Sequence, residues 1–213
     1  KEQYEGQVTV LSMGPPQAEE TLKEAISCGA DEAILIGDRA FAGSDTLATS
    51  YTLSRAIEKI EHYDLIICGR QTIDGDTAQV GPELAELLEI PFISYVSEVE
   101  EIANGRMRVQ RAIEEGHEEI ESPLPALITV AKEINVPRLP SLRGRSRAKS
   151  AVIPTWDAET LNVDPDRVGL TGSPTRVIKI FLPQRTRDGE LLQGSQEEQV
   201  ESLINKLKKD SLI

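Results

Sequence analysis

The sequence predicts an α/β protein with a doubly wound, mostly parallel sheet and helices on both faces. Short apolar runs alternate with amphipathic helical stretches over the first hundred or so residues. Uninterrupted apolar strands are typical of a parallel sheet that is covered on both faces, and right-handed crossovers place helices on either side. Aromatic residues make up only 4% of the chain, so we expect a core of Leu, Ile, Val and Ala.

Strand–helix units account for the first part of the chain. Strands are expected at residues 7–12, 33–36, 65–68 and 92–96. After each of the first three, apolar side chains recur at the spacing of a helix that buries one face. Pro15 and Pro16 suit a first helical turn, Gly29 suits a helix end, and Asp45 suits an N-cap.

The pattern changes after residue 96. Further strands are expected at residues 106–113 and 126–130, with a solvated turn at residues 114–119 between them. Residues 135–154 have little regular periodicity, residues 155–195 are loop-rich, and an apolar stripe marks a last helix: Val200, Leu203, Ile204 and Leu207. We therefore expect three parts, namely an α/β domain at 1–130, a partner-recognition loop at 131–154, and a C-terminal arm at 155–213 that packs on a partner.

Charge and composition exclude several classes of protein. The 23 Lys and Arg residues against 36 Asp and Glu residues give a net charge of −13, which argues against a general nucleic-acid binder. No apolar run approaches the roughly 20 residues that a membrane-spanning helix needs. The two cysteines, Cys28 and Cys68, are too few for a disulfide framework or a zinc cage, and they favour a reducing, cytoplasmic compartment.

The loop after the third expected strand is the strongest candidate for a ligand site. It is dense in small and polar residues, and backbone N–H groups at a helix start can hold a phosphate. Arg70 and Thr77 would add donors, whereas Asp74 and Asp76 would suit a ribose hydroxyl or a metal ion. The same residues are equally compatible with a simple turn and cap. The candidate residues are Arg70, Gln71, Asp74, Gly75, Asp76, Thr77, Ala78, Gln79 and Val80.

Two further loops would lie at the same edge of the sheet. Met13 and Gly14 follow the first strand, and Asp45, Thr46 and Thr49 begin the second helix. Ligands of open α/β sheets bind beyond the carboxyl ends of the strands, so three such loops indicate an adenine-nucleotide cleft. None of them matches a Walker A loop or a G-x-G-x-x-G motif.

Catalytic side chains are not evident. His62 and His117 are expected on the surface, and Cys28 and Cys68 are expected on apolar, core-facing positions. We find no nucleophile or acid–base pair at a recognisable spacing, so the sequence predicts binding and positioning of a cofactor.

A basic segment stands out in this acidic chain. Residues 132–149 hold six basic residues and one acidic residue, with Leu139 and Leu142 among them. The segment is either a solvated loop or a docking loop for an acidic partner with an apolar anchor. The residues expected to dock are Leu142, Arg143, Arg145, Arg147 and Lys149.

Together, these stretches resemble the beta subunit of electron-transferring flavoprotein. The resemblance covers nearly the whole chain, and its most specific part, residues 74–82, looks like the prokaryotic branch in which the beta subunit holds FAD. Ordinary members hold AMP at that place. The matching stretches are residues 10–15, 29–33, 45–50, 64–82, 124–130 and 137–144.

The resemblance implies a heterodimer with an alpha subunit that carries its own FAD. It implies electron transfer with a dehydrogenase, such as an acyl-CoA dehydrogenase, and in the FAD-holding branch hydride acceptance from NADH with flavin-based electron bifurcation. It places Met13, Gly14, residues 45–49 and residues 70–80 at the nucleotide, and Leu142 at the hydrophobic anchor of the recognition loop. It also implies an earlier strand–helix unit, which is missing before Lys1.

Two other classes share parts of this pattern. A universal-stress-like module that binds ATP or AMP would have the same α/β layer, but it would not explain the basic segment or the long C-terminal extension. A metal-dependent phosphohydrolase would use Asp74 and Asp76 together with a third ligand that the sequence does not reveal. A visible absorption spectrum separates the three classes, because only the flavoprotein is yellow.

Overall fold

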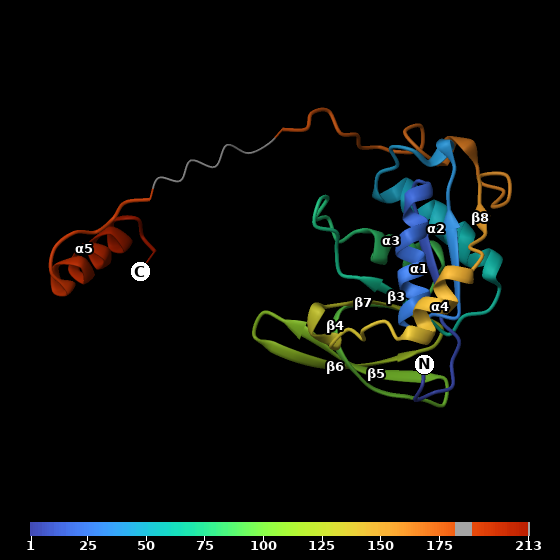
Figure 1. Ribbon diagram of the computed structural model, residues 1–213, viewed down its shortest axis with the longest axis horizontal. Helices are drawn as coiled ribbons and strands as arrows, with labels where there is room; N and C mark the ends of the chain where they lie inside the picture. The colour runs from blue at the N-terminus through green and yellow to red at the C-terminus, as the bar shows by residue number, and fades with distance from the viewer. Residues whose placement is uncertain (182–188, 213) are drawn as a thin grey trace. The chain divides into compact units, whose positions relative to one another are not determined.

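The computed structural model describes residues 1–181 and 189–212. Contacts divide the chain into two compact units, Lys1–Arg176 and Val177–Ile213. The first unit is a layered α/β structure in which helices flank the strands (Figure 1). The expected domain boundary at residue 130 falls inside this unit, which extends to Arg176.

The strands form two sheets within the described residues. The smaller sheet is all parallel, with order β1 (Thr9–Met13), β2 (Glu32–Ile36) and β8 (Thr155–Trp156). In the larger sheet, two parallel ladders precede two antiparallel ones. Its order is β3 (Leu65–Gly69), β7 (Ala126–Val130), β4 (Phe92–Ala103), β5 (Arg106–Ile113) and β6 (Gly116–Pro123). The predicted α/β class with mostly parallel pairing is therefore confirmed.

Helices cover both faces of the smaller sheet. Apolar side chains of α1 (Glu19–Cys28) pack on Ala33 and Leu35, whereas α2 (Thr46–Ile60) packs on Ile36, which belongs to the opposite face. The remaining helices are α3 (Val80–Leu87), α4 (Leu142–Ser150) and α5 (Gln196–Lys209). The core consists mainly of aliphatic side chains, as the low aromatic content predicts.

Two helix ends that were predicted from single residues are confirmed, namely the start of α2 at Asp45 and the end of α1 at Gly29. The Asp45 carboxylate accepts a hydrogen bond of 3.1 Å from the Ala48 backbone N–H, which makes it the N-cap of α2. Gly29 ends α1 with φ of +125°, a conformation that side chains with a Cβ rarely adopt.

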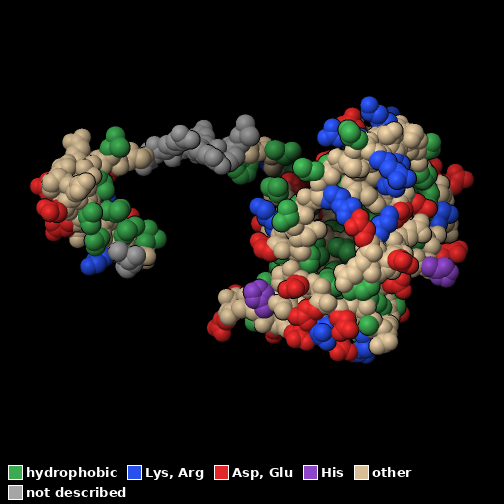
Figure 2. Space-filling view, turned by 60° about the horizontal axis from the view of Figure 1, so that its bottom comes forward, with side chains coloured by type: hydrophobic (Ala, Val, Ile, Leu, Met, Phe, Trp, Pro, Cys, Tyr) green, Lys and Arg blue, Asp and Glu red, His purple; other side chains and the backbone are tan. Residues whose placement is uncertain are grey.

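The prediction of a solvated turn at residues 114–119 is wrong for most of that stretch. Only Glu114 and Glu115 lie in the turn, and β6 begins at Gly116. The acidic residues of β6 face basic residues of β5, so that Arg108 pairs with Glu119 across 3.3 Å and Arg106 pairs with Glu121. Acidic and basic side chains intermingle along this edge of the unit (Figure 2). Cross-strand ion pairs thus allow a charged sequence to form a strand.

The recognition loop is also more ordered than expected, because α4 occupies its second half. The Ser141 hydroxyl accepts a hydrogen bond of 2.9 Å from the Gly144 N–H and caps the helix. Arg147 donates to the backbone carbonyls of Ile26, at 2.8 Å, and of Ala30. These carbonyls lie at the end of α1, so α4 is attached to α1 by one of the arginines expected to dock.

The first part of the expected arm, residues 155–176, packs on the α/β unit of its own chain. Leu161 and Val168 are buried in one cluster with Phe41 and Tyr51, and β8 pairs with β2. The apolar turns of this loop-rich stretch therefore have an intrachain core, which sequence spacing alone did not reveal.

The second unit contains α5, whose first turn is closed by a capping box between Ser195 and Glu198. Val200, Leu203 and Ile204 on α5 remain 40–56% exposed. The expected apolar run at 177–182 is exposed as far as Phe181, and Leu182 lies outside the described residues. Within the part of the chain that the structure describes, none of the helices has the length and apolar character needed to cross a bilayer.

Candidate functional site

Glu83, in the first turn of α3, joins the start of this helix to α2. Its carboxylate accepts hydrogen bonds from the Thr46 hydroxyl at 3.1 Å and from the Ser50 hydroxyl at 3.0 Å. Thr46 also lies 3.4 Å from the side-chain oxygen of Gln79. The start of α2 and the start of α3 are therefore held side by side. The strands that precede these two helices, β2 and β3, belong to different sheets, so the expectation that the loops share the edge of one sheet is wrong.

The third predicted loop lies at the end of β1. The Gly14 N–H donates to the Ile36 carbonyl at 3.0 Å, so this exit is fixed beside the end of β2. Met13 is half-buried against the core that contains Ile36 and Phe41. Met13 and Gly14 thus lie at the carboxyl ends of the smaller sheet, where open α/β folds bind ligands.

The loop at residues 70–79 presents its polar groups to solvent, since all but Ala78 are classed as exposed. Its base is organised by the Arg70 guanidinium, which lies 4.9 Å from the centre of the Tyr95 ring and donates to the Gln71 side chain at 2.8 Å. Gln71 in turn contacts Asp76.

Asp74 forms a local turn with its neighbours. Its carboxylate accepts the Gly75 N–H at 2.9 Å, and hydrogen bonds from the Thr72 hydroxyl and the Gly75 N–H lower the pKa of Asp74 below its usual value. Asp76 and Ala78 both have φ above +50°, which is uncommon for residues with a Cβ. Strain of this kind is often found where a loop holds a ligand.

Thr77 makes no hydrogen bond within residues 1–181 and 189–212. It precedes α3 by three residues, since α3 begins at Val80. At the start of α3, a Cβ added to Gly81 would lie 2.4 Å from the Thr129 methyl carbon. Gly81 therefore allows the helix to approach β7 closely and places the preceding loop at the end of the sheet.

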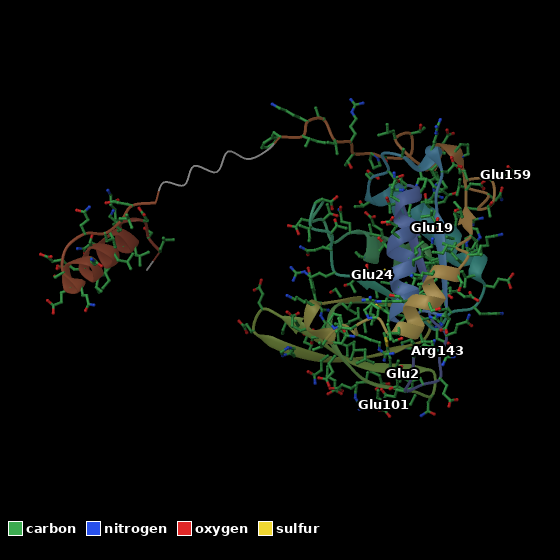
Figure 3. All side chains as sticks on the ribbon, viewed as in Figure 1. Glu2, Glu19, Glu24, Glu101, Arg143 and Glu159 are labelled. Carbon is green, nitrogen blue, oxygen red and sulfur yellow. The ribbon has the colours of Figure 1, made fainter. Side chains whose placement is uncertain are left out.

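The basic segment separates into two groups. Arg138 forms a two-pronged ion pair with Glu2, at 2.7 and 2.9 Å, and Arg147 is bound to α1. Arg143, Arg145 and Lys149 are exposed and form no ion pair with any described residue. Arg143 and Glu2 line the same groove beside α4 (Figure 3).

Apolar side chains accompany these free charges. Leu139 is 86% exposed and Leu142, the first residue of α4, is 88% exposed.

Among the described residues, no group of three or more His, Cys, Asp or Glu side chains is arranged to hold a metal ion. Both cysteines are free thiols, and burial raises the pKa of Cys68.

Sequence reasoning missed several residues that organise the site. Glu83, Ser50 and Tyr95 lie outside the loops that the sequence singled out, yet each contacts a residue of those loops. The position of Glu83 in the first turn of the third expected helix was the available signal, because a carboxylate there faces the loops that precede neighbouring helices.

The fold is an α/β layer whose loops carry polar groups beyond the strand ends, and comparison with known proteins assigns the chain to a family. The profile of the electron transfer flavoprotein domain family matches residues 1–161. The chain is 50% identical to electron transfer flavoprotein subunit beta of Thermoanaerobacterium thermosaccharolyticum over 97% of its own length and 79% of the relative.

Two further relatives agree. The chain is 45% identical to electron transfer flavoprotein subunit beta of Clostridium acetobutylicum, covering 100% of this chain and 82% of the relative. It is 44% identical to the caffeyl-CoA reductase-Etf complex subunit CarD of Acetobacterium woodii, covering 97% and 79%. The chain belongs to the electron transfer flavoprotein family, among the prokaryotic beta subunits, and its function is electron transfer. A beta subunit implies an alpha-subunit partner and a flavin in the assembly.

Proposed function

We propose that this subunit holds FAD between the start of α2 and the loop before α3. The observation that carries the proposal is the Glu83 bridge, because it joins the start of α2 to the start of α3, which are next to the stretches that the FAD-holding pattern implicates. Arg70, Thr77 and Gln79 supply donors that suit a phosphate, and none of them is buried. These residues therefore fit a nucleotide diphosphate. When bound, FAD would supply the redox chemistry, and the protein would position it.

The remaining predicted contacts belong to the same proposal. Gly14, Gly75 and Ala78 would offer backbone N–H groups, and Met13 and Val80 would offer apolar contact. Asp74 and Asp76 face solvent, where carboxylates suit ribose hydroxyls better than phosphate.

Identifying the nucleotide tests the proposal directly. The intact heterodimer is denatured, and the released nucleotides are separated by chromatography and counted per heterodimer. Two FAD molecules per heterodimer support the proposal, since the alpha subunit accounts for one. One FAD and one AMP would assign this chain to the AMP-holding type and would remove electron bifurcation. One FAD alone would contradict a nucleotide site in this subunit.

We further propose that NADH reduces the heterodimer and that the electrons reach a dehydrogenase of the acyl-CoA type, with bifurcation at the beta-subunit FAD. The names of two relatives support this choice, namely the caffeyl-CoA reductase-Etf complex subunit and the acryloyl-CoA reductase electron transfer subunit gamma of Anaerotignum propionicum, which is 44% identical. Use of NADH and two free thiols agree with a cytoplasmic setting.

Docking of the dehydrogenase is assigned to Leu142 with Arg143, Arg145 and Lys149. Leu142 is exposed at the start of α4, and the three charges lie on the same helix without intrachain partners among the described residues. Arg147 has a structural role in this surface, because its guanidinium hydrogen-bonds to the end of α1 and so keeps α4 in place.

The second unit, residues 177–213, is proposed to bind the alpha subunit. Val177, Ile178, Ile180 and Phe181 are 71–90% exposed, and α5 carries a half-exposed apolar stripe. Burying these side chains against another chain would remove apolar area from water, which favours association.

A further inference from the structure

Residues 169–175 fold back on the start of α2 and hold it by hydrogen bonds. The Asp45 carboxylate accepts the Thr175 N–H and the Thr175 hydroxyl, both at 2.9 Å, through one oxygen. The other oxygen caps α2 through the Ala48 N–H. The two oxygens of Asp45 thus accept three hydrogen bonds, and little of the carboxylate remains for a ligand.

The backbone of the same loop is held as well. The Asp45 N–H donates to the Ser173 hydroxyl at 2.8 Å, and Ser173 donates to the Gly169 carbonyl at 2.6 Å. The Gly169 N–H donates to the Ser44 hydroxyl at 3.2 Å. One distant segment therefore holds the side chains of Ser44 and Asp45 and the backbone N–H of Asp45.

The fit of this segment leaves no room for larger residues. Gly169 has φ of +58°, and a Cβ there would lie 2.1 Å from the Ala40 carbonyl oxygen. A Cβ on Gly172 would lie 2.1 Å from the Arg167 backbone. The contact at Gly169 shows that the segment packs directly on the backbone before α2, and the contact at Gly172 shows a tight local turn within the stretch.

We infer that residues 169–175 are a positioning segment for the nucleotide site and that Asp45 acts through Thr175 instead of binding the nucleotide itself. The inference rests on the proposed function, because it concerns the affinity of the same site. Asp45 starts the helix whose next residue, Thr46, bonds to Glu83 and so faces the loop before α3. A displaced Asp45 would shift Thr46 and open the junction between the two loops.

Four variants of the full chain, each assembled with the alpha subunit, test the inference. Thr175→Val removes the hydroxyl that donates to Asp45, whereas Thr175→Ser keeps a hydroxyl at this position. Asp45→Asn keeps an oxygen for the Ala48 N–H but turns an amide donor toward the Thr175 N–H. Thr171→Val is the matched control, because Thr171 lies in the same segment, is exposed, and makes no hydrogen bond with a described residue.

The measurements are the dissociation constants of FAD and of AMP for nucleotide-free heterodimer, the thermal midpoint, and hydrogen exchange at residues 46–49. We expect Thr175→Val and Asp45→Asn to weaken binding about fivefold or more and to speed exchange at residues 46–49. Thr175→Ser and Thr171→Val should bind as the parent does. A fifth variant, which combines Thr175→Val with Asp45→Asn, should lose little more than either single variant, because both substitutions break the same link.

The outcomes separate the inference from the proposed function. Equal affinities in the parent, Thr175→Val and Asp45→Asn would overturn the inference and leave the site intact. A lower thermal midpoint with unchanged affinity would also overturn it, since the segment would then be structural only. If the parent itself bound neither FAD nor AMP, the proposed function would fail and the inference with it.

Discussion

Thr77 and Asp74 lie in the same exposed loop but offer a phosphate opposite chemistry. Thr77 supplies a free hydroxyl donor, whereas Asp74 is a carboxylate whose lowered pKa keeps it charged. We expect Thr77→Val to weaken FAD binding by about 1.5–3 kcal/mol, as for a lost hydrogen bond to a charged group. Asp74→Asn should lose less, or bind more tightly if the carboxylate faces a phosphate.

Titration calorimetry on the two variant heterodimers measures both affinities. Because both residues are exposed, unfolding free energies should stay within about 0.5 kcal/mol of the parent, and this serves as the control for folding. A larger loss from Asp74→Asn than from Thr77→Val would show that the Asp74 carboxylate contributes more to binding than the Thr77 hydroxyl, and would refute the predicted order of the two residues.

Leu142 provides a second prediction at the scale of a residue. It is 88% exposed, so its truncation should not affect the fold. If Leu142 is the anchor, Leu142→Ala should lose about 1–3 kcal/mol of docking free energy to the dehydrogenase, mostly as faster dissociation. Surface plasmon resonance with the intact heterodimer gives the dissociation rate.

Leu139→Ala is the matched control, because Leu139 is 86% exposed in the same segment and precedes α4. It should dissociate nearly as the parent does. Equal effects of the two variants would mean that exposed apolar area in general, and not the position of Leu142, drives docking.

At the scale of elements, α4 carries two kinds of basic residue: Arg145 and Lys149, which are proposed to dock, and Arg147, which binds the end of α1. If these charges dock as proposed, Arg145→Glu with Lys149→Glu should slow association with the dehydrogenase and flatten its dependence on salt, because steering of an acidic surface would be lost. Arg147→Met should instead lower the unfolding free energy by about 1–3 kcal/mol, because the carbonyls of Ile26 and Ala30 lose their donor.

Stopped-flow reduction of the dehydrogenase across ionic strengths measures the first effect, and urea unfolding measures the second. Each variant controls for the other, because the double charge reversal should leave stability near that of the parent. If the reversal variant transferred electrons at the parental rate at every salt concentration, the docking surface would lie elsewhere.

The elements that sequence reasoning predicted well are those with a strong apolar pattern. Each of the four early strands and the first three helices has its own periodic signal, and Asp45 and Gly29 mark helix ends by local chemistry. β6 and α4 were not predicted, because the residues that stabilise them lie in other parts of the chain. β6 depends on the arginines of β5, and α4 depends on carbonyls at the end of α1.

The site shows the same division. The loops themselves were predictable, because small and polar residues follow apolar strands. The Glu83 bridge and the bonds from Thr175 to Asp45 were not, because they join residues 37 and 130 positions apart. No local pattern records contacts of that range.

At the scale of the whole molecule, the two units should respond differently to the alpha subunit. We expect rapid hydrogen exchange at residues 177–181 and 196–209 in the isolated subunit, slowed by the alpha subunit, because their apolar side chains are exposed. Residues 155–168 should be protected in both states, since Leu161 and Val168 are already buried. Equal exchange of α5 with and without the alpha subunit would show that the partner binds elsewhere.

The return of residues 169–175 to the start of α2 also has a consequence for synthesis of the chain. Asp45 leaves the ribosome 130 residues before Thr175, so the hydrogen bonds between them cannot form until nearly the whole first unit has been made. The strands and helices that precede residue 169 can pair earlier, through contacts closer in sequence. The start of α2 is therefore fixed after most of the sheet, and under the proposed function nucleotide binding would follow in the last stage of folding.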